Sequence, residues 1–140
     1  MSRILAIDYG QKKCGIAVSD PLRIIANGLT TVPTTGLMDY LERYFREEEV
    51  GTLVLGLPFH LDGNPAQLYP EIQALGKQLE KKFPGLVVAF QDETLSSVEA
   101  QRAILESGVS KKRRRDKTLV DKISAVIILQ QFMELARNGR

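Results

Sequence analysis

ILAIDYGQKKCGIAVS, residues 4–19, is the stretch of sequence that decides the fold of this chain. Residues 4–7 form a short apolar run that ends on Asp8, a pattern typical of a buried strand. Residues 9–13 indicate a turn, and residues 14–19 predict a second strand. We therefore expect the chain to begin with an antiparallel hairpin. Gly10 and Gly15, on either side of the turn, either allow tight turning or let a phosphate approach Asp8.

Outward from this hairpin, the pattern changes to alternating strands and helices. A third extended segment is expected at 22–32, with Asn27-Gly28 as the point where it could break. Further strands are expected at 52–55 and 86–90, and helices at 37–45, 68–83, 96–107 and 120–135. Such alternation favours parallel pairing in the second half of the chain. The predicted fold class is α/β, a mixed five-stranded sheet flanked by helices, in a single domain over residues 1–140.

The composition excludes several kinds of catalytic site. The chain has 140 residues, which suffices for one domain with a sizeable core. Its one cysteine, Cys14, cannot form an internal disulfide or a thiolate zinc site alone, and its apolar neighbours predict burial. Its one histidine, His60, makes a two-histidine metal site unexpected, and is either solvated or in contact with nucleic acid. Carboxylates, hydroxyls and a hard metal ion remain for hydrolytic chemistry.

No segment indicates a membrane partner or export. No apolar run approaches the roughly 20 residues that a membrane span needs. Only four apolar residues separate Arg3 from Asp8, so a signal peptide is not expected. We therefore expect a cytoplasmic protein.

Positive charge is concentrated in one segment. The net charge is only +2, but residues 111–117 hold six basic residues and one acidic residue, a local charge of +5. This basic block is either a solvated loop or a contact for a nucleic-acid backbone. The same two interpretations apply to the lysines in the turn after Asp8. The candidate nucleic-acid-binding residues are Lys12, Lys13, Lys111, Lys112, Arg113, Arg114, Arg115 and Lys117.

Acidic residues lie at or next to one end of each of three predicted elements. Asp8 ends the first strand, Asp92 and Glu93 end the last strand, and Asp121 falls in the expected first turn of the final helix. Sites in α/β sheets gather at the carboxyl ends of strands. Converging carboxylates suit Mg²⁺ or Mn²⁺, and two such ions about 3.5–4 Å apart can cleave a phosphodiester. The pattern therefore predicts a metal site.

Structural explanations for the same acids stay open. Asp92 could cap a turn, Glu93 could be a surface residue, and Asp121 could be an acid favoured by the helix dipole. Strand parity puts Asp92 and Glu93 on opposite faces, so only one of them is expected to bind the ion. Gly56-Leu57-Pro58 is expected to shape the exit of the fourth strand beside the site.

Four blocks of the chain resemble one known family. They are residues 6–20 (AIDYGQKKCGIAVSD), 56–63 with Gly56-Leu57-Pro58, 92–100 with Asp92-Glu93-Thr94, and 117–130 around Asp121. In this order they are similar to the YqgF/RuvX family, the pre-16S rRNA nucleases related to the Holliday junction resolvase RuvC.

The resemblance implies a ribonuclease H-like fold and a metal-dependent phosphodiesterase that matures the 5′ end of 16S rRNA. It implies Asp8, Glu93 and Asp121 as catalytic acids and metal ligands, Mg²⁺ or Mn²⁺ as cofactor, and structured RNA or branched DNA as partner. The protein is expected to be a monomer or a homodimer.

The chain departs from the family pattern at three positions. Thr94 replaces the usual Arg after Asp-Glu, so neither a phosphate contact nor a structural partner of Asp92 is expected from this position. Thr118 replaces the usual Gly after Lys117. Lys12-Lys13 stands where Lys-Arg is common, which keeps the charge but not the bidentate fork.

Three other functions remain as alternatives. A Holliday junction resolvase acting as a dimer on branched DNA is the closest. A nucleotide-binding module is the second, because Asp-x-Gly at a hairpin also opens the phosphate-binding turn of the actin and sugar-kinase superfamily. The third is a non-catalytic RNA-binding or ribosome-assembly factor that keeps the fold.

Overall fold

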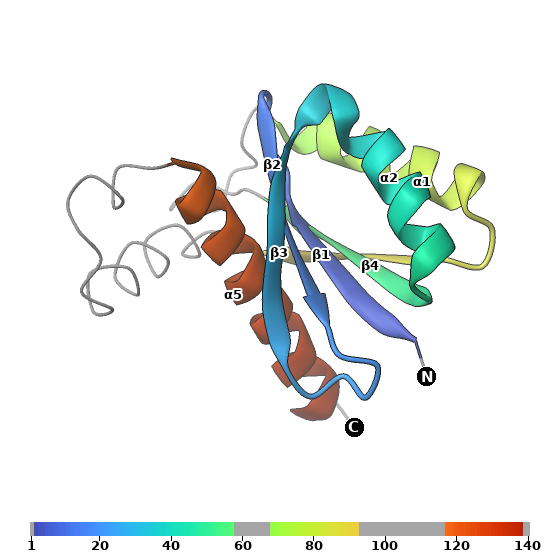
Figure 1. Ribbon diagram of the computed structural model, residues 1–140, viewed down its shortest axis with the longest axis vertical. Helices are drawn as coiled ribbons and strands as arrows, with labels where there is room; N and C mark the ends of the chain where they lie inside the picture. Colours follow the sequence, from blue (N-terminus) through green and yellow to red (C-terminus); the bar gives the residue numbers. More distant parts are fainter. Residues whose placement is uncertain (1, 58–67, 93–116, 139–140) are drawn as a thin grey trace.

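The computed structural model describes residues 2–57, 68–92 and 117–138, which form a sheet between two layers of helices (Figure 1). The strands are β1 (Arg3–Asp8), β2 (Lys13–Ser19), β3 (Ala26–Pro33), β4 (Val50–Leu57) and β5 (Val87–Asp92). The helices are a 3-10 turn, η1 (Thr34–Gly36), followed by α1 (Leu37–Glu47), α2 (Tyr69–Lys82) and α5 (Lys117–Asn138). The expected helix at 96–107 and residues 111–116 lie outside the described residues.

The five strands form one mixed sheet in the order β3-β2-β1-β4-β5. β1 pairs antiparallel with β2, and β2 pairs antiparallel with β3. β1 pairs parallel with β4, and β4 pairs parallel with β5. The expected opening hairpin, parallel second half and mixed five-stranded sheet are therefore confirmed. The carboxyl ends of β1, β4 and β5 lie at one edge of the sheet.

Alternating residues of each strand build two separate cores. Leu5 and Ile7 of β1 belong to a core with Leu41 of α1 and Ile72 of α2. The intervening residues of β1 belong to a second core beneath α5. That core consists of Ile4, Ala6, Ala17, Val54, Ala125, Ile128, Leu129 and Met133. Because the pleat sends neighbouring residues to opposite faces, parity along a strand shows which helical layer a residue faces.

The segment expected to begin the third strand is a turn instead. β3 starts at Ala26, because the carboxylate of Asp20 accepts the backbone N–H groups of Ile24 (2.6 Å) and Ile25 (2.8 Å). A side chain that captures backbone donors in this way competes with strand pairing. Arg23 has a φ of 58° within the turn. The apolar run here predicted a strand, but local hydrogen bonding decided otherwise.

Two other boundaries differ from the sequence expectation. β3 continues through Asn27-Gly28, and the irregularity is a register shift: Ile16 pairs with Thr30 and Ala17 with Gly28. α5 begins at Lys117, three residues before the expected start, so Lys117 is helical rather than part of a loop. Cys14 is buried, as its surroundings predicted.

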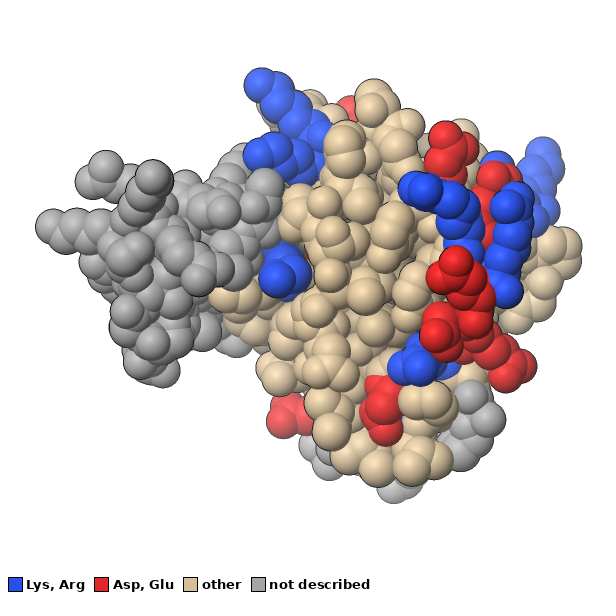
Figure 2. Space-filling view, viewed as in Figure 1, with Lys and Arg blue, Asp and Glu red and all other residues tan. Residues whose placement is uncertain are grey.

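Charged side chains of both signs gather over α1, on the right of Figure 2, whereas the centre of that view shows little charge. One ion pair ties the two helices of this layer, with Nζ of Lys82 2.6 Å from Oε1 of Glu42. The lysine lowers the pKa of Glu42 through that hydrogen bond and its charge. In the part of the chain that the structure describes, no helix combines the length and apolar content needed to cross a membrane.

Candidate active site

Asp8 lies at the carboxyl end of β1, on the face of the sheet that α5 covers. Ala6, two residues earlier and thus of the same parity, belongs to the core beneath α5. Asp8 is partly exposed, whereas the four apolar residues before it are buried. Asp8 therefore lies where the face of the sheet covered by α5 reaches the protein surface.

Two glycines flank Asp8 on this face. Gly15 is its direct partner across the antiparallel β1–β2 pair. On the other side, Gly56 directly follows Leu55, the last β4 residue paired with β1, and has the parity of Val54 in the α5 core. At the positions directly across from Asp8, both neighbouring strands therefore carry a glycine.

The helix α5 runs antiparallel to β1 and begins at the carboxyl edge of the sheet. It packs chiefly on β2, with β1 and β3 on either side. Its approach to β3 is close at Gly28, where an added Cβ would lie 3.0 Å from Cγ of Lys122 and 3.4 Å from Cγ2 of Val126. Residues 127–134 lie beside residues 24–26 at the start of β3. The first turns of α5 therefore lie at the same edge of the sheet as Asp8.

Position 121 belongs to this part of α5. It precedes Ala125 by one helical turn and Ile128 by two, and both of these side chains are buried against the sheet. Position 121 therefore lies on the sheet-facing side of the helix. The side chain of Asp121 itself lies outside the described part.

The expectation that Asp121 sits in the first turn of its helix was wrong. α5 starts four residues earlier, at Lys117, and its first turn contains no acidic residue. The helix dipole acts mainly within the first turn. It therefore gives only a weak reason for an acid at position 121.

Strand parity separates the two neighbouring acids at the end of β5. Val88 and Phe90 lie against α2, where a Cβ added at Gly76 would be 3.5 Å and 3.0 Å from them. Position 92 has the same parity and so belongs to the α1/α2 face, not to the face of Asp8. Glu93 follows directly and lies outside the described residues.

The turn that carries Lys12 and Lys13 is held by the residue after β3. Thr34 donates its hydroxyl to the carbonyl of Gly10 (2.7 Å) and its backbone N–H to the carbonyl of Lys12 (2.9 Å). Position 10 requires a glycine because the backbone of Lys13 passes close to it: an added Cβ would lie 2.6 Å from the carbonyl oxygen of Lys13. The turn is thus anchored from both the backbone and the side chain of Thr34.

Both lysines of this turn are exposed. Lys13 has the parity of Gly15, the partner of Asp8, and so belongs to the face of the candidate site. The predicted positive charge beside Asp8 is therefore present on the surface. Of the other candidate basic residues, Lys117 begins α5, and residues 111–115 lie outside the described part.

On the opposite face, Tyr9 ties the end of β1 to α2. Its hydroxyl donates a hydrogen bond to Oε2 of Glu71 at 3.3 Å. Burial, followed by the charge of Glu71, raises the pKa of Tyr9 above its ordinary value. The Tyr9 hydroxyl therefore remains protonated at neutral pH. Its hydrogen bond to Glu71 holds the backbone directly after Asp8 against α2.

Sequence reasoning missed Ser124 and Thr34. Ser124 is fully buried, and its hydroxyl has no hydrogen-bond partner among the residues that the structure describes. The available signal was a serine three residues after Asp121 inside an apolar helix. No sequence signal pointed to Thr34, because its role depends on the distance between two loops.

Strand parity and the docking of α5 put Asp8, position 121, Ser124 and Lys13 on one face of the sheet, toward its carboxyl end. The structure does not test the whole predicted triad, since in residues 2–57, 68–92 and 117–138 no three metal-ligating side chains form a group. His60 and Thr94 lie outside the described residues.

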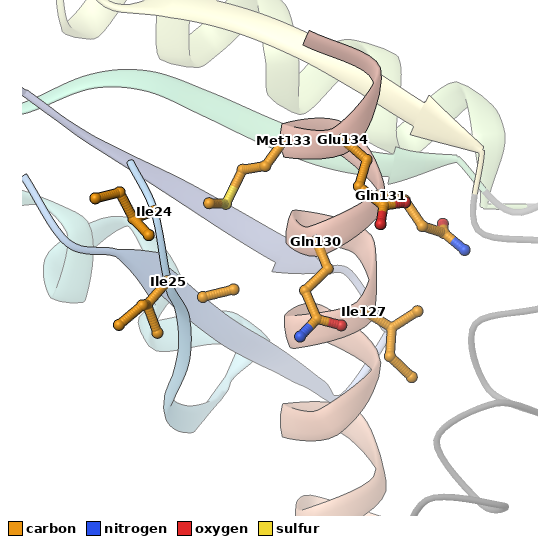
Figure 3. Close-up of a pocket in the computed structure, with 8 residues that line it drawn as sticks. Ile24, Ile25, Ile127, Gln130, Gln131, Met133 and Glu134 are labelled. Atoms are coloured by element: carbon orange, nitrogen blue, oxygen red, sulfur yellow. The ribbon is translucent and has the colours of Figure 1, made fainter. Parts of the chain in front are cut away.

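A pocket of about 710 Å³ lies toward the other end of α5 (Figure 3). Its lining is mostly apolar and amide side chains, namely Ile24, Ile25, Ala26, Ile127, Gln130, Gln131 and Met133, together with Glu134. Ile24 and Ile25 are more than half exposed and come from the turn held by Asp20. The pocket lacks a cluster of carboxylates and lies one to three helical turns beyond Ser124, so the candidate site is elsewhere.

Curated proteins closely similar to this chain cover almost all of it. A protein of Bacteroides fragilis named "Putative pre-16S rRNA nuclease" is 47% identical over 137 residues, which is 98% of this chain and 99% of that protein. A protein of Porphyromonas gingivalis with the same name is 48% identical over 134 residues, covering 96% and 97% of the two chains.

Two solved structures share the fold. The fowlpox virus resolvase bound to Holliday junction DNA has a TM-score of 0.58 and 12% identity, and the match covers 96% of this chain and 98% of that one. T. thermophilus RuvC bound to a Holliday junction substrate has a TM-score of 0.56 and 19% identity, covering 99% and 97%. The ribonuclease H-like architecture expected from the resemblance is thereby confirmed.

The profile of one family spans nearly the whole chain. That family is RuvX, described as Holliday junction resolvase, and the match runs over residues 2–135. Together with relatives of nearly 50% identity over almost the full length, this match shows that the chain belongs to the RuvX family.

Proposed function

We propose that this chain is a metal-dependent nuclease that cleaves phosphodiester bonds in structured RNA, with precursor 16S rRNA as its substrate. One observation carries the proposal. Asp8 lies between Gly15 and Gly56 at the carboxyl ends of the parallel strands, and position 121 of α5 lies over the same face of the sheet. The names of the close relatives support the choice of RNA. Because precursor rRNA is matured in the cytoplasm, the proposal also places the protein there.

Asp8, Glu93 and Asp121 would hold Mg²⁺ or Mn²⁺. Carboxylate oxygens are the ligands these ions prefer, and the glycine directly across from Asp8 leaves room for an approaching cation. The parity of β5 supports Glu93 over Asp92 as the third ligand. The buried hydroxyl of Ser124 also fits a polar site here. When bound, such ions supply Lewis-acid chemistry that activates water and stabilises the leaving oxygen.

The remaining candidate residues would bind the nucleic-acid backbone. Lys12 and Lys13 are exposed next to Asp8 and would attract phosphates toward it. The basic block, Lys111, Lys112, Arg113, Arg114, Arg115 and Lys117, would extend this contact, since Lys117 begins the helix that carries Asp121. Recognition would follow the shape of the RNA rather than base edges.

Cleavage of a precursor 16S rRNA fragment with Mg²⁺ or Mn²⁺ tests the proposal. We expect Asp8→Asn, Glu93→Gln and Asp121→Asn each to lower kcat/KM at least about 100-fold, because each removes a charged ligand. Asp39→Asn is the matched control, since Asp39 is an exposed carboxylate in α1. Full activity in both Asp8→Asn and Asp121→Asn would refute the proposal.

A Holliday junction resolvase is the second candidate function, and the description of the matching family favours it. Symmetric cutting of a four-way junction requires two copies of the active site. The same preparation should therefore be assayed on a four-way DNA junction and examined by sedimentation. Faster cleavage of the junction than of the rRNA fragment, by a dimer, would favour the resolvase.

A further inference from the structure

Ser124 has an unusual environment for a serine inside a helix. Such a serine ordinarily faces solvent or donates to the carbonyl four residues earlier, here that of Val120. Ser124 does neither: it is 0% exposed, and its hydroxyl has no partner within the described part of the chain. A buried hydroxyl without a partner carries a desolvation cost, so its presence calls for a reason.

A second buried serine shows how this fold normally accommodates a hydroxyl. Ser19 is also 0% exposed, but its Oγ accepts the N–H of Ile4 at 2.9 Å and donates to the carbonyl of Asp20 at 2.9 Å. Ser19 joins β1 to β2 and is explained by those bonds. Within the described residues, no hydrogen bond accounts for Ser124 in the same way.

Helix geometry places Ser124 over the candidate site. At about 100° per residue, Ser124 lies about 160° around the axis from both Lys122 and Val126, because each is two residues away. Those two residues contact β3 at Gly28. Because α5 lies across β2, the flank that carries Ser124 faces β1 and β4. Asp8 ends β1 on this side of the sheet.

Ser124 is also one helical turn from Asp121. Residues three apart on a helix have their Cβ atoms about 5–6 Å apart, within reach of a hydrogen bond between a hydroxyl and a carboxylate. Asp8, position 121 and Ser124 therefore lie toward the same end of the sheet, on two different elements.

We propose that Ser124 is a positioning residue for the metal site. When a divalent cation is bound, its hydroxyl donates a hydrogen bond to a carboxylate oxygen of Asp121 and fixes the orientation of that ligand. The proton stays on Oγ of Ser124. This inference rests on the proposed metal-dependent function. It gives an acceptor to a buried hydroxyl that has no partner among the described residues.

Isothermal titration calorimetry of the whole chain with Mn²⁺ tests this role without an activity assay. Ser124→Ala should weaken Mn²⁺ binding at least about 10-fold, as expected for loss of a hydrogen bond that orients a ligand. Its Tm without metal should not fall, because the substitution removes an unpartnered polar group. Ser19→Ala is the matched control: it should lower the Tm, by leaving the N–H of Ile4 without its acceptor, and keep the Mn²⁺ affinity.

The outcomes separate this inference from the proposal on which it rests. If the wild type binds Mn²⁺, Asp8→Asn does not, and Ser124→Ala binds as the wild type does, Ser124 has no positioning role. If the wild type fails to bind Mn²⁺, or Asp8→Asn binds equally well, the metal site itself is refuted, and this inference with it. Weaker Mn²⁺ binding by Ser124→Ala with an undiminished Tm supports the role.

Discussion

Asp8 of β1 is paired directly with Gly15 of β2, and both residues share the face of the sheet beneath α5. Directly opposed residues in an antiparallel pair have Cβ atoms about 4.5–5.5 Å apart, so any side chain at position 15 would stand beside the carboxylate. Gly15 is the third residue of β2 and lies outside the turn. The close approach of the backbone in the turn therefore accounts for a glycine at position 10. The Asp8 carboxylate directly across the strand pair accounts for a glycine at position 15.

Gly15→Ala should reduce metal-dependent cleavage at least about 10-fold, because the added methyl group intrudes beside Asp8. The measurement is kcat/KM on the rRNA fragment at saturating Mn²⁺, with the Tm recorded alongside. Gly36→Ala serves as control, since a Cβ there meets no atom within 4 Å. A folded Gly15→Ala variant with full activity would show that the space beside Asp8 is not used.

Lys13→Gln should weaken RNA binding several-fold and reduce the slope of log Kd against log salt by about 1, because one phosphate contact is lost. Filter binding at several salt concentrations measures both quantities. Lys81→Gln, an exposed lysine of α2 on the other helical layer, should leave both unchanged. Equal effects of the two substitutions would mean that general charge, not the position beside Asp8, attracts the RNA.

Ile128→Ala should lower the free energy of unfolding by about 2–5 kcal/mol, because Ile128 is fully buried between α5 and the sheet. Leu135→Ala, on the same helix but 60% exposed, should change it by less than about 0.5 kcal/mol. Urea unfolding followed by circular dichroism measures both. A small effect of Ile128→Ala would contradict the docking of α5 described above.

Acid should selectively destabilise the turn before β3. The N–H of Ile25, and also that of Ile24, hold the pKa of Asp20 below its ordinary value of 3.8. A lowered pKa in the folded state means that the stabilisation is present above the ordinary value and is lost as the pH falls through the lowered one. The Tm of the wild type should therefore exceed that of Asp20→Asn at pH 6, and the gap should close as the pH falls well below 3.8. A gap that stays constant from pH 6 to pH 2 would assign the effect to something other than this charge.

Much of the fold was predictable, because each strand and helix in the described residues leaves a local apolar pattern. The hairpin of residues 4–19, the parallel second half and the burial of Cys14 all follow from such patterns. The segment before Ala26 was predicted wrongly, because the carboxylate of Asp20 competes for backbone donors that periodicity alone assigns to a strand. The start of α5 was misplaced because the polar residues before Val120 continue the helix without an apolar signal.

For the candidate site too, some features follow from the sequence and others only from the tertiary structure. The sequence by itself determined which residue types could act, since a chain with one cysteine and one histidine leaves carboxylates as its ligands, and it determined that Asp8 ends a strand. Only the tertiary structure decided which face Asp8 shares with position 121, that glycines flank it, and that Ser124 is buried on the same face. The physical reason is that strand parity is local, whereas the docking of α5 depends on contacts between residues more than a hundred positions apart.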